Sequence, residues 1–123
     1  MIKVMWFLKR AQNLSLDEFR QWWLTRHCHD VARAQAPHLL RYVVNIRANE
    51  DDLSGKPSSE PEWDGVAEQW FRDASAFNAV YGAPSTTRAD TLANTSRFQR
   101  LIVTEHDIPP PHPVVAAQVP GPA

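Results

Sequence analysis

The sequence has little of several residue types, and each scarcity excludes a class of protein. Cys28 is the single cysteine among 123 residues, so an internal disulfide and a multi-cysteine metal cage are excluded. The four glycines form no phosphate-binding loop, which argues against a nucleotide cofactor. No apolar run approaches the roughly 18 residues of a membrane span, and the N-terminal MIKVMWFLKR lacks the arrangement of a signal peptide. We therefore expect a cytoplasmic protein with one core.

The charge balance limits the classes of partner, and the distribution of proline indicates where the domain ends. With 13 Lys and Arg against 14 Asp and Glu the net charge is −1, and no long run of either sign favours nucleic acid or a membrane surface. A small molecule or a second protein chain is the expected partner. Six of the ten prolines lie in residues 109–123, which is typical of polyproline II or disorder. We therefore predict a domain over residues 1–108 and a proline-rich tail over 109–123.

The order of strand and helix signals predicts the fold. Ser15 and Glu18 have the spacing of a capping box, and apolar residues continue at helical spacing from Phe19 until Pro37. Strand signals occupy 2–8, 39–47, 63–71 and 98–106, a polar loop occupies 49–62, and helical segments occupy 74–81 and 85–93. This β-α-β-β-α-β order predicts a ferredoxin-like α+β fold, in which a four-stranded antiparallel sheet carries its helices on one face.

The strands carry apolar residues on both faces, although helices can cover only one. In the first strand, one face carries Ile2, Val4, Trp6 and Leu8, and the other face carries Met5 and Phe7. The second strand offers one side Leu40, Tyr42, Val44 and Ile46, and the other side Leu39 and Val43. Because a large apolar patch in water is unfavourable, we expect a second copy of the chain to cover the other face as a two-fold homodimer.

Several motifs also carry a family resemblance. The stretches MIKVMWFLKR, LSLDEFRQWWLTRH, RYVVN, DGVAEQWF and LIVTEH, in this order, resemble the EthD domain of the dimeric α+β barrel proteins over about residues 1–108. The resemblance implies a sheet-to-sheet dimer with a ligand cleft in each monomer. The family includes lactone isomerases, polyketide-processing dehydratases and ether-degradation proteins, and related barrels include cyclases and cofactor-free monooxygenases. Such a range does not fix one reaction.

Two histidines compete for a functional role. A metal site built on both is unfavourable, because side chains two apart on a helix point roughly 200° away from each other. His27 follows Trp23 by four residues and Phe19 by eight, so it should face the sheet as a core histidine or as an acid or base. His29 should be exposed unless the helix bends. Asp30 could orient His27 or lie at the surface. Spacing from the family's tryptophan selects His27, whereas spacing from Tyr42 selects His29.

The other candidates are aromatic or polar residues of the strands and the first helix. The resemblance places Tyr42 at the position of a strand tyrosine whose phenol can polarise a carbonyl, and a core tyrosine is the alternative. Cys28 is more simply structural than nucleophilic. A cleft for a flat cyclic substrate would use residues that could equally be core or surface: Trp6, Phe19, Trp23, Asn45, Glu68 and Trp70.

The sequence therefore predicts a cofactor-independent isomerase or lyase for a small cyclic lactone or polyketide-like substrate. His27, or alternatively His29, would move a proton next to a carbonyl, and Tyr42 would stabilise the developing oxyanion. One alternative is a cofactor-free monooxygenase, in which the substrate itself activates oxygen. Another is a non-catalytic ligand-binding protein of an ether- or aromatic-degradation pathway.

Overall fold

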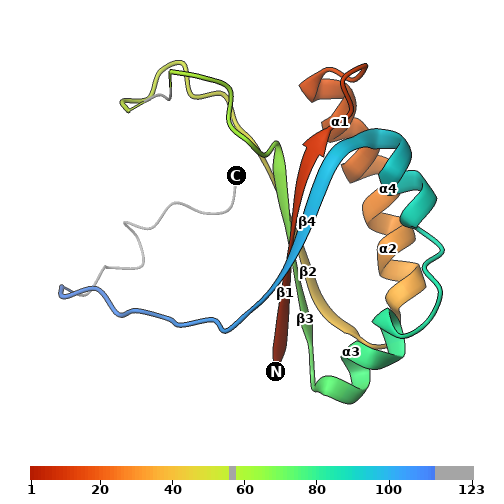
Figure 1. Cartoon of the computed structure of the whole chain (residues 1–123). Coiled ribbons are helices and arrows are strands. Elements are labelled where there is room, and N and C mark those ends of the chain that lie inside the picture. Colours follow the sequence, from red (N-terminus) through yellow and green to blue (C-terminus); the bar gives the residue numbers. More distant parts are fainter. Residues whose placement is uncertain (56–57, 113–123) are drawn as a thin grey trace.

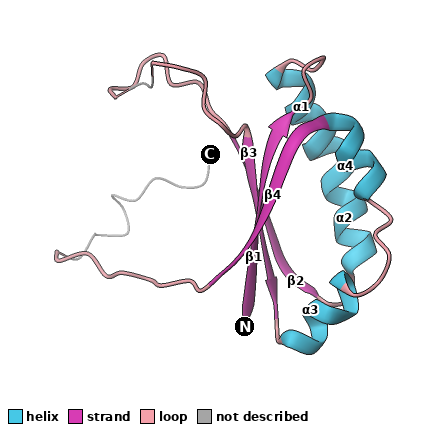
Figure 2. Ribbon diagram, in the orientation of Figure 1, coloured by secondary structure: helices cyan, strands magenta, loops and turns pink. Residues whose placement is uncertain are grey.

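A four-stranded antiparallel sheet carries helices on one face in the computed structural model, which describes residues 1–55 and 58–112 (Figure 1). The strands are β1 (Ile2–Arg10), β2 (Leu39–Ile46), β3 (Gly65–Phe71) and β4 (Thr95–Val103), in the spatial order β2-β3-β1-β4. The helical segments are α1 (Leu16–Trp22), a π-helical turn η1 (Trp23–His27), α2 (Cys28–Gln35), α3 (Ala74–Tyr81) and α4 (Arg88–Asn94). Figure 2 shows these helices together on one side of the sheet. The predicted ferredoxin-like α+β fold is confirmed.

Most predicted boundaries agree with the structure to within a few residues. The first helical run ends at Gln35, two residues before Pro37, because the backbone of Ala36 is extended as the residue before a proline prefers. The last strand begins at Thr95, three residues before the predicted start, because α4 passes into β4 without an intervening loop. The predicted tail lies mostly outside the described residues, which end at His112.

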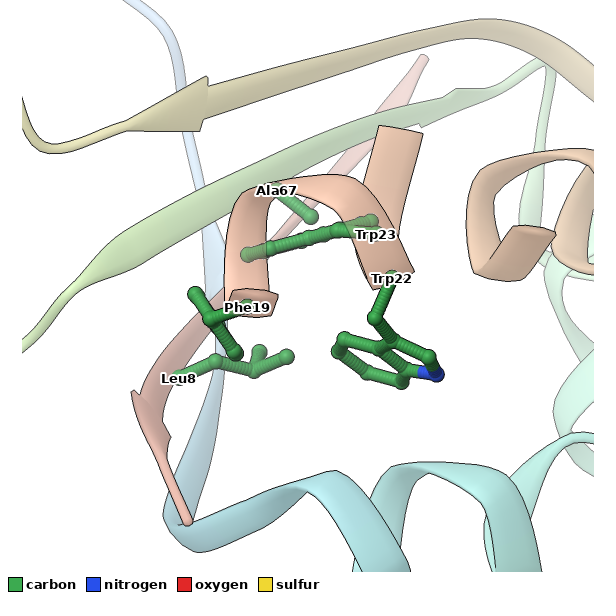
Figure 3. Packing of buried hydrophobic residues seen from close by; sticks show 5 residues of the cluster. All are labelled: Leu8, Phe19, Trp22, Trp23 and Ala67. Carbon is green, nitrogen blue, oxygen red and sulfur yellow. The ribbon is translucent and has the colours of Figure 1, made fainter. Parts of the chain in front are cut away.

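The core lies between the sheet and the first helical run. Phe19 and Trp23 are fully buried against Leu8 of β1 and Ala67 of β3 (Figure 3). A second cluster joins Val4 and Phe71 to Ala76 of α3. Each fully buried aromatic side chain of this kind stabilises the fold by about 1.5–3 kcal/mol. The predicted grouping of alternate β1 residues on one face is therefore confirmed, and this face packs against the helices.

The predicted grouping of β2 residues by face is wrong at Leu40. Leu40 is 53% exposed, because the pairing with β3 shifts register between Leu39 and Arg41. Leu39 takes the inward place and packs against the second cluster beside Phe71. A bulge of this kind reverses the faces of the residues before it, which alternation alone does not reveal.

The other face of the sheet carries no helix in the described part of the chain. Trp70 is buried there at 8% exposure, but the other apolar side chains that point to this face are only partly buried or exposed, among them Met5, Phe7, Val43, Val66 and Leu101. The loop between β2 and β3 and the segment after β4 extend on this side (Figure 1). None of the described helices is long and apolar enough to cross a membrane.

Candidate active site

The helix that carries the candidate histidine begins with the predicted capping box. Ser15 Oγ accepts from the backbone N–H of Glu18 at 3.1 Å, and the Glu18 carboxylate accepts from the backbone N–H of Ser15 at 3.0 Å. The run then widens into the π-helical turn, where the backbone N–H of Cys28 donates to the carbonyl of Trp23, five residues back. A π turn therefore separates two α-helical segments at the point where the candidate histidine lies.

The π turn decides which tryptophan contacts His27. Trp22 stacks on the imidazole with ring centroids 4.5 Å apart and an interplanar angle of 22°. The sequence predicted Trp23 as the partner at helical spacing, but Trp23 points toward Ala67 of the sheet while Trp22 points away from it (Figure 3). In a regular α-helix residues five apart lie about 140° apart around the axis. The wider turn brings Trp22 and His27 onto one face.

His27 is 6% exposed and both of its ring nitrogens face polar atoms of α4. Nδ1 lies 3.1 Å from Asp90 Oδ2, and Nε2 lies 3.4 Å from Thr91 Oγ1. We assign the proton to Nδ1, because a carboxylate can only accept. Thr91 Oγ1 donates to the carbonyl of Thr87 at 3.2 Å, so the lone pair of Nε2 is available to a ligand. Asp30, for which an orienting role and a surface position were both open, pairs with Arg33 at 2.6 Å.

Asp90 serves as the acceptor for a cluster of donors. Besides His27, its carboxylate accepts from Trp22 Nε1 at 3.0 Å, from Arg26 and from Asn94 Nδ2 at 3.2 Å. Burial alone would raise its pKa, but the bonds from Trp22, Arg26 and His27 hold that pKa below its usual value. Burial lowers the pKa of His27, and Asp90 only partly opposes this effect. The imidazole is therefore neutral near pH 7 and suited to act as a base.

A cavity of about 540 Å³ lies beside His27, between the sheet and the helices. Its lining includes Trp6, Trp23, His27 and Tyr42, four of the residues predicted from the sequence. A volume of this size suits a small organic molecule. The structure therefore brings the predicted histidine, tyrosine and two tryptophans to one concave site.

Two hydrogen-bonded groups lie on the sheet side of this cavity. The Tyr42 hydroxyl accepts from Trp23 Nε1 at 3.0 Å, and burial raises the pKa of Tyr42 to about 12. Its own proton is directed to no acceptor among the described residues, so the phenol can donate to a ligand. Separately, the Tyr81 hydroxyl accepts from Trp6 Nε1 at 3.0 Å and donates to Gln69 Oε1. Gln69 is 2% exposed, and its Nε2 donates to Gln35 Oε1 at 2.8 Å.

The remaining predicted site residues do not line this cavity. His29 is exposed, and Phe19 is fully buried in the core. Asn45, Glu68 and Trp70 project from the opposite face of the sheet, because each occupies the alternate position to an inward residue. There Glu68 accepts from Asn45 at 3.0 Å and pairs with Lys3 at 2.8 Å, and Lys3 lies 4.6 Å from the centre of the Trp70 ring. Their assignment to the cleft is therefore corrected.

Sequence reasoning missed the residues that complete the site. Asp90 is 63 positions from His27, and no local pattern marks it. Gln69 and Tyr81 also come from elements distant in sequence, although the inward alternation of β3 could have selected Gln69. Only the packing of α3 and α4 over the sheet identifies Tyr81 and Asp90.

Comparisons with known proteins agree with the fold. The family model of the EthD domain matches residues 11–98, so the chain belongs to the EthD domain family. No curated protein matches the sequence significantly. The chain is similar to an EthD family protein of Bacillus halodurans, with 14% identity and a TM-score of 0.66 over 86% of this chain and 99% of that one.

Two similar structures have stated activities. One is SnoaB, a cofactor-independent oxygenase of Streptomyces nogalater, with 14% identity and a TM-score of 0.54 over 88% of this chain and 97% of that one. The other is a hydroxynitrile lyase of Passiflora edulis, with 15% identity and a TM-score of 0.55 over 87% of this chain and 96% of that one. At these identities the likeness shows the fold alone, and a role in catalysis or in binding a small molecule fits it.

Proposed function

We propose that the protein is a cofactor-independent isomerase or lyase that moves a proton on a small cyclic substrate, such as an aromatic-derived lactone or a polyketide-like compound. One observation carries this proposal: the buried imidazole of His27 is held through Nδ1 by Asp90 while Nε2 remains available beside the cavity. A histidine oriented in this way is the common arrangement of a general base. Trp6, which is only partly buried, supplies flat apolar surface for the ring of the substrate, and the buried Trp23 positions the Tyr42 hydroxyl through its Nε1.

The proposed reaction begins when Nε2 of His27 takes a proton from the carbon next to the substrate carbonyl. Asp90 then stabilises the imidazolium that forms. The Tyr42 phenol donates a hydrogen bond to the carbonyl oxygen as negative charge develops on it, and its raised pKa keeps the phenol protonated at neutral pH. Return of the proton to another carbon gives isomerisation, and return to a leaving oxygen gives dehydration.

Solvent-deuterium incorporation tests this proposal directly. The purified protein is incubated in D₂O with muconolactone, which carries a carboxylate, and with a panel of neutral cyclic ketones and unsaturated lactones, and proton NMR follows exchange and product formation. We expect His27→Gln to lower the rate about 100-fold or more, whereas the matched control His29→Gln retains it, because His29 is exposed and outside the cavity. Full activity in His27→Gln with loss in His29→Gln would refute the assignment.

Two further measurements with the same compounds distinguish two other functions. Consumption of dissolved oxygen during turnover would favour a cofactor-free monooxygenase, and the similar structure SnoaB is described as a cofactor-independent oxygenase. Quenching of tryptophan fluorescence by these compounds without any conversion would favour a non-catalytic binding protein. Both outcomes keep the cavity as the ligand site and remove the proton-transfer step.

We also propose that the helix-free face of the sheet forms a homodimer. Leu101 on this face is 44% exposed and neighbours Met5, which supports burial against a second copy. Sedimentation should give about twice the chain mass of 14.0 kDa, and Leu101→Glu should give the monomer. Leu92→Glu is the control, because Leu92 is 54% exposed on α4 and away from this face. A monomeric native protein would exclude the dimer.

The domain limits and the location are proposals as well. We propose that residues 1–108 form the folded domain, so removal of 109–123 should leave the melting temperature unchanged.

The single free cysteine supports a cytoplasmic location, which fractionation of the host cell would test.

A further inference from the structure

The cavity beside His27 has an unusual charge for a protein of net charge −1. Arg88 and Arg100 both line it, and so does His38. No aspartate or glutamate is among the described residues that line it. Asp90 lies behind His27, where its carboxylate is already bonded to Trp22, Arg26 and His27. The cavity therefore presents positive charge without a carboxylate to neutralise it.

The two arginines differ from most cations of the described chain. Neither Arg88 nor Arg100 has a carboxylate within 4.0 Å among the described residues, whereas a carboxylate partner is present for Lys3, Lys9, Arg10, Arg20, Arg26, Arg33, Arg47 and Arg97. Arg41 and Arg72 are also without one in the same part of the chain, but neither lines the cavity. Unpaired guanidinium groups are thus found together at a concave site.

Aromatic contacts hold both guanidinium groups in place. Arg88 lies 5.7 Å from the centre of the Phe98 ring. Arg100 lies 5.3 Å from the centre of the Tyr81 ring and 5.6 Å from that of Phe77. Neither guanidinium group donates a hydrogen bond to a carboxylate among the described residues, so its N–H groups are available, and their fork matches the two oxygens of a carboxylate. Restraint before binding also reduces the entropy lost when a ligand binds.

We propose that the cavity selects an anionic substrate, a cyclic compound with a carboxylate that Arg88 and Arg100 bind while its ring lies against Trp6. This inference rests on the proposed function, since it names the substrate class of the same cavity. The carboxylate is a handle for recognition and takes no part in the proton transfer. Its position fixes which carbon of the ring faces Nε2 of His27.

Calorimetric titration with a matched pair of probes tests the inference. The anion is 2-naphthoate and the neutral analogue is 2-naphthamide, which share the ring and differ in charge. We expect the native protein to bind 2-naphthoate at least tenfold more tightly than the amide. Added salt should weaken the binding of 2-naphthoate and leave that of the amide nearly unchanged.

Variants locate the binding of the anion. Arg88→Gln and Arg100→Gln should each raise the dissociation constant of 2-naphthoate about tenfold, because each removes a charge-assisted hydrogen bond, and should change that of the amide less than twofold. Arg72→Gln is the matched control, since Arg72 is exposed and outside the cavity. Circular dichroism checks folding. If Arg100→Gln does not fold, Arg88→Gln and the comparison of the two probes on the native protein decide.

Failure of this inference differs from failure of the proposed function. Equal affinity for the two probes, no binding of either at millimolar concentration, or no effect of the arginine variants overturns the anionic substrate. Deuterium exchange that depends on His27 can still persist in those cases on neutral compounds. Conversely, selective binding of the carboxylate without such exchange supports the anionic site and removes the proposed catalysis.

Discussion

Replacement of Asp90 by asparagine tests whether this carboxylate holds the candidate base. Each carboxylate oxygen accepts from two donors: Oδ2 from Trp22 and His27, and Oδ1 from Arg26 and Asn94. An asparagine side chain has one acceptor oxygen, so two of the four donors lose their acceptor in either orientation. The negative charge is lost as well. The variant therefore weakens the link between α4 and the π turn.

The structure sets the size of the expected effect. The Asp90 side chain is 22% exposed, so solvent screens its bonds only in part. A hydrogen bond to a charged group contributes about 1.5–3 kcal/mol, and the asparagine keeps a neutral version of some of these bonds. We expect Asp90→Asn to lower the free energy of unfolding by about 2 kcal/mol and the melting temperature by about 8 °C. Asp17→Asn, which removes an exposed partner of Arg20, should change stability by less than about 1 kcal/mol.

The pH dependence has a definite sign. The pKa of His27 in the folded protein lies below its usual value of 6.5, so the unfolded chain binds a proton first as the pH falls. Stability due to neutral His27 is therefore present above pH 6.5 and declines as the pH falls toward the folded pKa. Loss of the Asp90 charge lowers that pKa further, because burial then acts on the imidazole with less opposition. In Asp90→Asn the loss of stability due to His27 should therefore extend over a wider range and end at a lower pH than in the native protein.

Thermal unfolding between pH 8 and pH 5 and NMR titration of the His27 ring protons measure both effects. The reasoning would be refuted if Asp90→Asn melted like Asp17→Asn and His27 titrated at the same pH in the variant and the native protein. Loss of activity in Asp90→Asn without any change in stability or in the titration of His27 would also contradict the role of Asp90 as the orienting acceptor of the imidazole.

Three further substitutions have defined outcomes. Gly65→Ala should lower the free energy of unfolding by about 1–3 kcal/mol in urea denaturation, because an added Cβ would lie 2.5 Å from Trp23 Cζ3 and 3.0 Å from the carbonyl oxygen of Asn45; native stability would mean that the buried indole can move. Tyr42→Phe should leave Trp23 Nε1 without its acceptor at a cost of about 1–3 kcal/mol. It should also remove part of the loss of stability between pH 10 and pH 12, because the native phenol keeps its proton to about pH 12 while the unfolded one ionises near 10.0; an unchanged alkaline limb would contradict the raised pKa. Ser15→Ala should cost about 1 kcal/mol through loss of the capping box, and a loss below 0.3 kcal/mol, on the order of error for such measurements, would contradict that bond's contribution.

The fold was predictable because its signals are local or periodic. The capping box at Ser15, the alternation of β1 and the order of the strands each depend on neighbouring residues, and each has one structural solution. The resemblance to the EthD domain supported the same order and indicated Tyr42 together with either His27 or His29. The polar loop between β2 and β3 was recognised by composition alone, since no apolar residue repeats there.

The site was less predictable because it depends on contacts between distant elements. Asp90 reaches His27 only after α4 packs beside the first helical run, and no pattern in 85–93 distinguishes it from a surface aspartate. The π turn was also invisible, because the spacing of Trp22, Trp23 and His27 fits a regular helix. Glu68 was wrongly assigned to the cleft for a different reason, because the face of β3 that packs against the helices was not identified from the sequence. Ala67 and Gln69 face the helices, so strand alternation directs Glu68 to the opposite face.

The tryptophans explain why so small a domain carries so much aromatic surface. Four of the five donate their indole N–H to another side chain, as Trp6 does to Tyr81, Trp22 to Asp90, Trp23 to Tyr42 and Trp70 to Glu105. A buried indole packs against the core and also needs a hydrogen-bond acceptor. Because packing has already restricted the indole, its hydrogen bond fixes the position of the acceptor with little further loss of conformational entropy. Three of these acceptors belong to the cavity or to the base beside it. A phenylalanine in place of an indole would preserve much of the apolar packing but remove one hydrogen bond from the acceptor, so the indoles contribute to the geometry of the site as well as to its apolar surface.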